Sequence, residues 1–187
     1  MSFLSKILGN ASGPTPEEIS AQNHSHLVEW GLSHVIIRGD SQILALGLGD
    51  GTDLEKLLAL AFVGHVTGID SSAVSVEHAK ELSQWAISER RCSIVQGNAI
   101  TLPFGAESFD LVAAFYPEFL RPDPEKSFGE VGRVLKRGGS FLLVSGTDGV
   151  GSFKTDELRK VFRSVDFGVV RIDEDSDLGR LTAVAVK

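Results

Sequence analysis

The chain has 187 residues, of which 42% are hydrophobic and 23% charged, a balance that suits one globular domain rather than a disordered chain. Its net charge of −7 argues against capture by nucleic acid or by an anionic membrane, both of which favour a basic face. The single cysteine, Cys92, excludes an internal disulfide and a cysteine-rich metal site. The chain shows no apolar stretch of membrane-spanning length, and its opening residues lack the basic start of a secretory signal. We therefore expect a cytoplasmic protein.

The first expected element in chain order is a helix that ends at Gly31. The linker-like segment 10–16 precedes it, and Thr15 and Pro16 supply a cap and a first helical proline. This helix carries His24 and His26, whose side chains diverge because they are two positions apart, so we expect no metal pair. Either histidine could reach a neighbouring cleft as a base or simply be solvated.

The chain is organised around an apolar strand, residues 43–46, that runs into Gly47, Gly49 and Gly51. Glycine tolerates positive φ and lets a ligand approach the backbone, so this spacing after a strand indicates a loop for an adenosine-type cofactor. An ordinary tight turn is the alternative. Residues 52–61 then show helical spacing, which would aim the amino end of a helix at the ligand.

A second short strand, residues 64–70, ends in Asp70. Its separation from Gly51 along the sequence is the one at which a parallel βαβ unit has an acid that accepts hydrogen bonds from both ribose hydroxyls. Alternatively, Asp70 could only cap the helix that starts near Ser72. A dinucleotide fingerprint would require glycine at the position of Thr52, which weakens a nicotinamide reading.

The rest of the chain alternates between helical and strand patterns. A helix is expected over 72–90, a strand over 92–95, a loop with Asn98, a strand over 108–115, a helix leading to the double glycine at 138–139, a strand over 140–145, a helix over 153–165, and two antiparallel strands over 169–173 and 181–186.

The glycine pattern, the acid that ends the second strand and the segment Arg133-Val134-Leu135-Lys136-Arg137-Gly138-Gly139 together resemble class I S-adenosylmethionine-dependent methyltransferases. The resemblance runs from about Asn23 to the carboxyl terminus and is closest to the small-molecule branch typified by ubiquinone and menaquinone biosynthesis. It implies an α/β fold, a Rossmann-like doubly wound seven-stranded sheet that is mostly parallel with a C-terminal antiparallel hairpin. It further implies one methyltransferase domain over residues 1–187, with an N-terminal segment and cap helix over 1–38 and the core over 39–187.

The resemblance implies S-adenosylmethionine as cofactor and S-adenosylhomocysteine as product. The cofactor contacts that it implies are Gly47, Leu48, Gly49, Gly51, Asp70, Ser71, Asn98, Ala99 and Phe115. The chain departs from the family at Ala45, where an acid commonly helps to hold the amino-acid end of the cofactor, and at Asn98, where an acid reads the adenine amino group. An asparagine carbonyl can still accept that hydrogen bond.

The implied reaction is in-line methyl transfer to a small-molecule acceptor, with no metal. Tyr116 and Glu118 follow the fourth strand and could orient or deprotonate an acceptor, or merely shape the mouth of the site. The chain lacks the Asn/Asp-Pro-Pro-Tyr motif of amino-group methylases that act on nucleobases or glutamine, and with its acidic balance we expect no nucleic-acid partner. We expect no membrane partner either, and a homodimer is left open. A non-catalytic module that binds the cofactor and an NAD(P)-dependent oxidoreductase are the alternatives.

Overall fold

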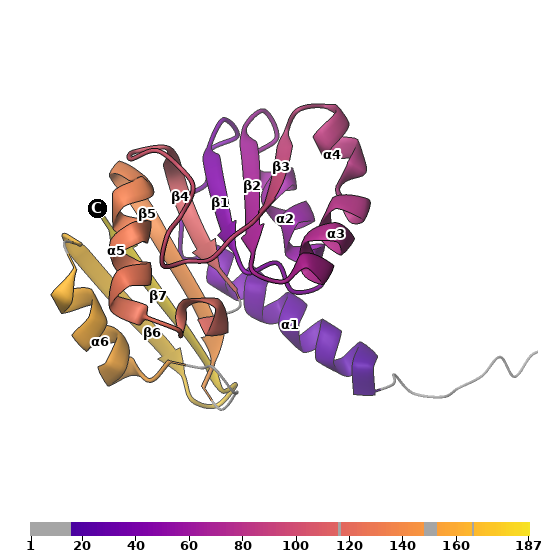
Figure 1. The fold of residues 1–187 in the computed structure, drawn as a ribbon. Helices are drawn as coiled ribbons and strands as arrows, with labels where there is room; N and C mark the ends of the chain where they lie inside the picture. The colour runs from indigo at the N-terminus through magenta and orange to yellow at the C-terminus, as the bar shows by residue number, and fades with distance from the viewer. Residues whose placement is uncertain (1–15, 116, 148–152, 166) are drawn as a thin grey trace, which may run out of the picture.

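The structure, a computed structural model, describes residues 16–115, 117–147, 153–165 and 167–187 and shows a twisted sheet with helices on both faces (Figure 1). The strands are β1 (Gln42–Leu46), β2 (His65–Asp70), β3 (Cys92–Gln96), β4 (Phe109–Ala114), β5 (Leu135–Gly146), β6 (Val169–Asp175) and β7 (Arg180–Val186). The helices are α1 (Pro16–Leu32), α2 (Thr52–Leu60), α3 (Ala73–Leu82), α4 (Gln84–Ser88), the short 3₁₀ helix η2 (Pro117–Leu120), α5 (Pro124–Val134) and α6 (Thr155–Ser164).

The seven strands lie in the order β3-β2-β1-β4-β5-β7-β6. The first five strands along the chain run parallel, whereas β7 is antiparallel to both of its neighbours, β5 and β6. This confirms the doubly wound, mostly parallel sheet with a C-terminal antiparallel hairpin. The carboxyl ends of the parallel strands share one edge of the sheet, where such folds bind ligands. We call this edge the cofactor end.

Two apolar clusters, one on each face, hold the layers together. Leu44 and Leu46 point toward α5 and α6, and Ile43 and Ala45 point toward α1, α2 and α3. Because helices cover both faces, β1 is apolar at successive positions rather than at alternate ones. The loops of the cofactor end therefore follow directly from strands that the core holds in place.

The helix expected over 72–90 is interrupted at Ser83. Ser83 has φ −95° and ψ 13°, its side chain is fully buried, and it separates α3 from α4. Its hydroxyl has no backbone hydrogen-bond partner among the described residues, and the break coincides with its full burial. The expectation of one uninterrupted helix was therefore wrong.

The fifth strand begins at Leu135, well before the expected start at Ser140. The double glycine remains part of the sheet because the Gly138 amide donates to the Lys187 carbonyl at 2.9 Å, and the Lys187 amide donates to the Gly139 carbonyl at 3.1 Å. Gly138 has φ +75°, which makes it an irregular position inside a strand rather than a turn before one.

Candidate cofactor site

The loop between β1 and α2 is built on three glycines in the left-handed region. Gly47, Gly49 and Gly51 have φ values of 75°, 51° and 81°. At Gly51, which precedes the first turn of α2, a Cβ atom would lie 3.1 Å from the Ala79 Cα. The loop thus needs glycine for both backbone conformation and space, and it leaves its surface bare of side chains.

Asp70 is held in place by the two loops that meet at the end of β2. Its Oδ2 accepts a hydrogen bond from the Leu48 amide at 2.7 Å, and its Oδ1 accepts one from the Ser72 amide at 2.8 Å. The N-cap of α3 is Ser72, whose hydroxyl accepts from the Ser75 amide, so capping does not account for Asp70. Each carboxylate oxygen keeps a further lone pair for a ribose hydroxyl.

A cavity of about 260 Å³ opens beside this loop. It brings together the expected residues Gly47, Gly49, Asp70, Ser71 and Glu118. Its lining also includes Ser75 and Phe119, which the sequence interpretation had not assigned to the site. Only their positions in the sequence could have indicated them, since Ser75 lies in the first turn of the helix after Asp70 and Phe119 follows Glu118.

The remaining expected contacts are not among the residues that line this cavity. The side chains of Leu48, Ala99 and Phe115 are buried in the core, so they could meet a ligand only through their backbone. Asn98 is exposed, and its Oδ1 accepts a hydrogen bond from the Thr101 amide at 3.0 Å. Its role toward an adenine ring stays a prediction. Tyr116 lies outside the described residues.

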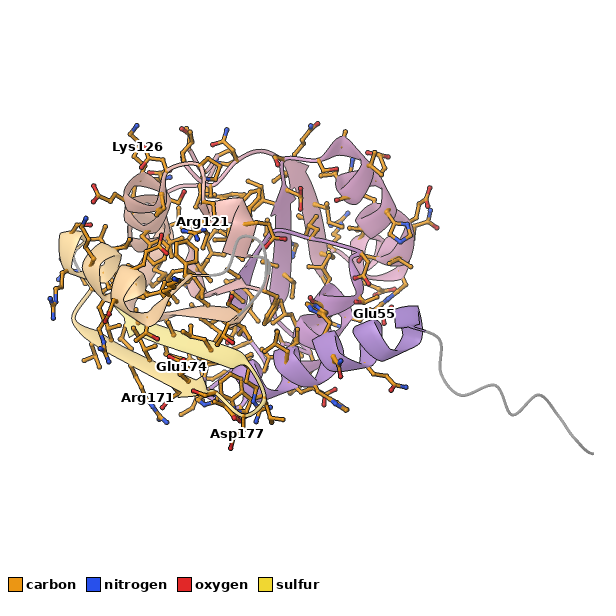
Figure 2. The ribbon with its side chains drawn as sticks, turned by 90° about the horizontal axis from the view of Figure 1, so that it is seen from below. Glu55, Arg121, Lys126, Arg171, Glu174 and Asp177 are labelled. Carbon is orange, nitrogen blue, oxygen red and sulfur yellow. The ribbon has the colours of Figure 1, made fainter. Side chains whose placement is uncertain are left out.

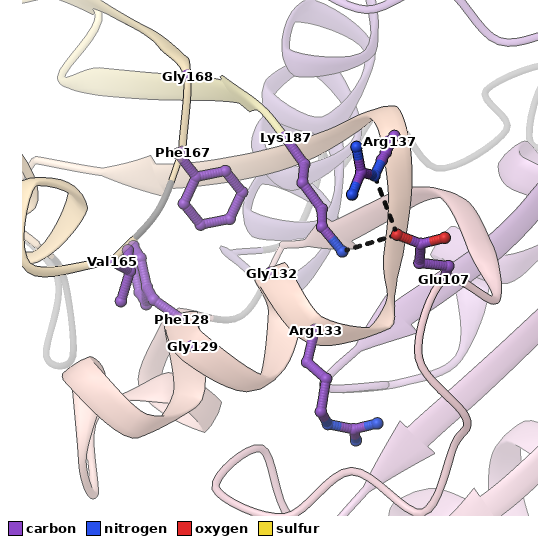
Figure 3. A pocket seen from close by; sticks show the side chains of 10 residues that line it. All are labelled: Glu107, Phe128, Gly129, Gly132, Arg133, Arg137, Val165, Phe167, Gly168 and Lys187. Carbon is purple, nitrogen blue, oxygen red and sulfur yellow. Dashed lines mark ion pairs between the residues drawn. The ribbon is translucent and has the colours of Figure 1, made fainter.

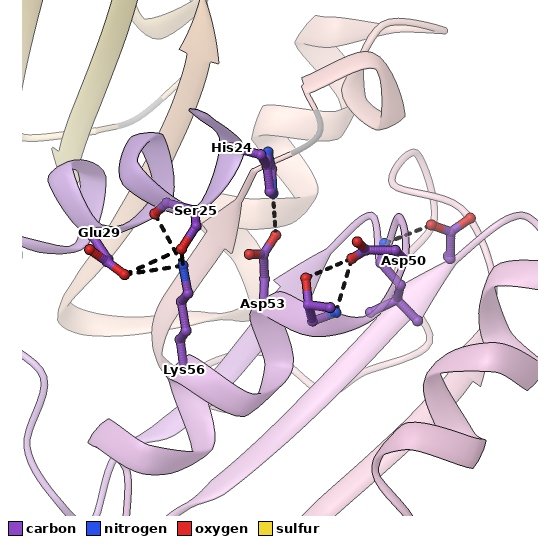
Figure 4. A network of polar contacts seen from close by, with 9 residues as sticks. His24, Ser25, Glu29, Asp50, Asp53 and Lys56 are labelled. Carbon is purple, nitrogen blue, oxygen red and sulfur yellow. Dashed lines mark hydrogen bonds and ion pairs between the residues drawn. The ribbon is translucent and has the colours of Figure 1, made fainter. Parts of the chain in front are cut away.

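The cap helix α1 is joined to α2 by polar contacts (Figure 4). His24 Nε2 lies 2.8 Å from Asp53 Oδ2, and Lys56 Nζ donates to the Ser25 hydroxyl at 2.7 Å. The hydrogen bond to Asp53 raises the pKa of His24, against the opposing effect of burial. Asp53 follows the glycine loop directly, so α1 is anchored next to the cofactor site.

Position 45, where the family commonly has an acid, lies in the apolar core. Ala45 is almost fully buried and packs with the apolar side chains beneath α2. Nearby, burial alone would raise the pKa of Asp50, but hydrogen bonds from the Thr52 hydroxyl and amide hold that pKa below its usual value. An ionised carboxylate is therefore kept within the glycine loop.

A second, larger cavity of about 740 Å³ lies at the opposite end of the sheet (Figure 3). There, Arg137 and Lys187 both point toward Glu107, at 3.6 Å and 3.9 Å. None of its lining belongs to the glycine loop or to the end of β2. Size alone therefore does not identify the cofactor site; the smaller cavity has the glycines and the fixed carboxylate.

The described residues contain no cluster of three or more potential metal ligands. Likewise, none of the described helices has the length and apolar character that a membrane span requires.

Comparisons with known proteins agree with this geometry. A family model described as a methyltransferase domain matches residues 44–143, just over half of the chain. Methyltransferase YcgJ of Bacillus subtilis is 36% identical over 110 residues, covering 57% of this chain and 41% of that protein. Demethylmenaquinone methyltransferase of Lactiplantibacillus plantarum is 31% identical over 129 residues, covering 67% of this chain and 54% of that protein.

A solved methyltransferase structure has the same fold. The crystal structure of an S-adenosylmethionine-dependent methyltransferase from Aquifex aeolicus superposes with a TM-score of 0.73 at 18% identity, covering 92% of this chain and 98% of that one. The chain spans about half or less of the length of the curated relatives it matches. With the matched family model, the glycine loop and the fixed Asp70, the chain belongs to the class I S-adenosylmethionine-dependent methyltransferases.

Proposed function

We propose that this protein transfers a methyl group from S-adenosylmethionine to a small-molecule acceptor. The observation that carries the proposal is the cavity in which Gly47, Gly49 and Asp70 meet Glu118 at the cofactor end. A bare glycine surface and a carboxylate with spare lone pairs fit an adenosyl amino acid. Several relatives act on small molecules by name, demethylmenaquinone among them.

The protein's part in such a reaction is to bind, orient and exclude water. The cofactor supplies an activated sulfonium methyl group, so no acid–base triad is required. Gly47 and Gly49 would lie against the methionine portion, Asp70 would hold the ribose, and Asn98 would accept from the adenine amino group. The segment around Glu118 would then hold the acceptor in line with the methyl group.

Calorimetry tests the proposal directly. S-adenosylmethionine, S-adenosylhomocysteine and NADH are titrated separately into wild type, Asp70→Ala and Asp70→Asn. We expect both adenosyl ligands to bind wild type, both variants to bind them much more weakly, and NADH not to bind. Asp70→Asn keeps one acceptor oxygen for the Leu48 amide, and circular dichroism of both variants separates lost binding from lost folding. Glu55→Gln, an exposed substitution on α2, is the matched control.

Two outcomes would overturn the proposal. If NADH binds and the adenosyl ligands do not, the protein is better described as an oxidoreductase. If S-adenosylhomocysteine binds but S-adenosylmethionine does not, the protein is a non-catalytic binding module.

A further inference from the structure

The two ends of the sheet differ in charge. Figure 2 looks onto the cofactor end, with Asp177 at one margin. Among the described residues in the loops and strand ends here, acids outnumber the bases Arg121, Lys154 and Arg180. These acids are Asp50, Asp70, Glu118, Asp123, Asp175 and Asp177.

At the opposite end the balance is reversed. The described acids there are Asp40, Glu89, Glu107 and Asp110. They are outnumbered by the bases Arg38, Arg90, Arg91, Lys136, Arg137 and Lys187. The net charge of the chain is therefore unevenly distributed, and its negative potential is concentrated where the cofactor cavity opens.

The two arginines at the cofactor end are engaged with acids. Arg121 forms an ion pair with Glu157, and Arg180 lies 2.8 Å from Asp175. Neither belongs to the cavity lining, and none of the described residues that line the cavity is basic. An anionic acceptor would therefore meet like charge and find no cation in the cavity lining to hold it.

Glu118 and Phe119 lie side by side on η2 and line the same cavity as the cofactor glycines. Glu118 is exposed, and Phe119 is half-buried against the core. A carboxylate next to an aromatic ring is a combination that recognises an ammonium group, through a charge-assisted hydrogen bond and a cation–π contact.

We propose that the methyl acceptor is an amine, recognised in its ammonium form by Glu118 and Phe119. This inference rests on the proposed methyl transfer. The bound ammonium first loses one proton to solvent through the Glu118 carboxylate, which frees the nitrogen lone pair. The nitrogen then bonds to the methyl carbon as the carbon–sulfur bond breaks, the electron pair of that bond stays on sulfur, and the methylated ammonium releases its second proton to water.

The test uses protein saturated with S-adenosylhomocysteine and three probes of similar size: phenethylamine, 2-phenylethanol and phenylacetate. We expect the amine to bind best and the carboxylate worst. Glu118→Gln should weaken amine binding roughly three- to tenfold and leave the alcohol unchanged. Glu118→Lys should reverse the preference toward phenylacetate. Glu125→Gln, an exposed acid in the first turn of α5, is the matched control and should change nothing.

A second arm supplies S-adenosylmethionine labelled in its methyl group, with a panel of amines, phenols and carbon acids. Labelled N-methyl product is the expected result. The inference would be overturned if the amine and the alcohol bound equally well, or if Glu118→Gln had no larger effect than Glu125→Gln. It would also be overturned if none of the amines were bound or methylated. If S-adenosylhomocysteine itself fails to bind, it is the proposed function that fails, and the two failures are thereby distinguished.

Discussion

The contact between His24 and Asp53 should contribute a pH-dependent part of the folding free energy. The two side chains are 26% and 8% exposed, and no described residue donates a hydrogen bond to the other carboxylate oxygen of Asp53. Removing His24 therefore leaves a buried carboxylate without this partner. Hydrogen bonds to charged groups contribute about 1.5–3 kcal/mol, so we expect His24→Ala to lower the free energy of unfolding by about 2 kcal/mol near pH 6.

The pH dependence has a definite sign. The hydrogen bond to Asp53 raises the His24 pKa above its usual 6.5, with the charges of Asp53 and Asp50 adding to it and burial and Lys56 opposing it. Because the pKa is higher in the folded state, the stabilisation is complete below about pH 6.5 and is lost as the pH rises through the folded pKa. The lowered carboxyl pKa of Asp50 acts only in the acid range, outside this window.

Urea unfolding followed by circular dichroism at about pH 6 and about pH 9 measures the effect. His24→Ala should lose most stability at the lower pH, equivalent to about 4–8 °C in melting temperature for a chain of this size. His24→Gln keeps a neutral hydrogen bond, so its deficit should be smaller at every pH, with the same dependence on pH, because both variants remove the group that titrates. His26→Ala, exposed on the same helix, is the control. A deficit of His24→Ala that grows as pH rises, or that His26→Ala shares, would refute the reasoning.

Further predictions concern two glycines and one arginine. Gly51→Ala should destabilise the fold by about 1–2 kcal/mol and weaken cofactor binding, because Gly51 has a positive φ and lies close to Ala79. Gly129 lies inside α5, where an added Cβ would meet nothing within 4 Å, so Gly129→Ala should stabilise the fold by about 0.5–1 kcal/mol. Thermal melts of both variants and calorimetry with the cofactor check these predictions. Arg133→Ala removes donors to the carbonyls of Phe104 and Leu102, so it should lower stability by about 1–2 kcal/mol and speed proteolysis of the loop that contains them, unlike Arg137→Ala at an exposed position. Equal proteolysis rates would contradict this.

Local sequence patterns sufficed for much of the fold and for the centre of the site. The strand before Gly47 and the acid at the end of the next strand carry their signals within a few residues, so the loop and Asp70 could be placed from the sequence. The extension of β5 to Leu135 could not, because it depends on pairing of Leu135 with Phe109 and of the double glycine with Lys187, both far away in the sequence. The break at Ser83 depends on tertiary burial, which helical spacing does not report.

The polar contacts between α1 and α2 also could not be predicted from the sequence. His24 and Asp53 lie 29 positions apart and meet only because α1 packs beside α2. From the sequence alone His24 could be a base or a solvated residue, and no local pattern indicated an acidic partner. Long-range pairs of this kind follow from helix packing, and a single sequence carries no local mark of them.

The place of β7 in the sheet sets an order on how the fold is completed. β7 is the last strand along the chain, yet it lies between β5 and β6 and pairs with both. Until β7 is synthesised and docked, β6 has no neighbour and β5 keeps an open edge of unpaired amides and carbonyls. A nascent chain therefore passes through a stage in which the part of the sheet formed by β5, β6 and β7 is incomplete and prone to pairing with other chains.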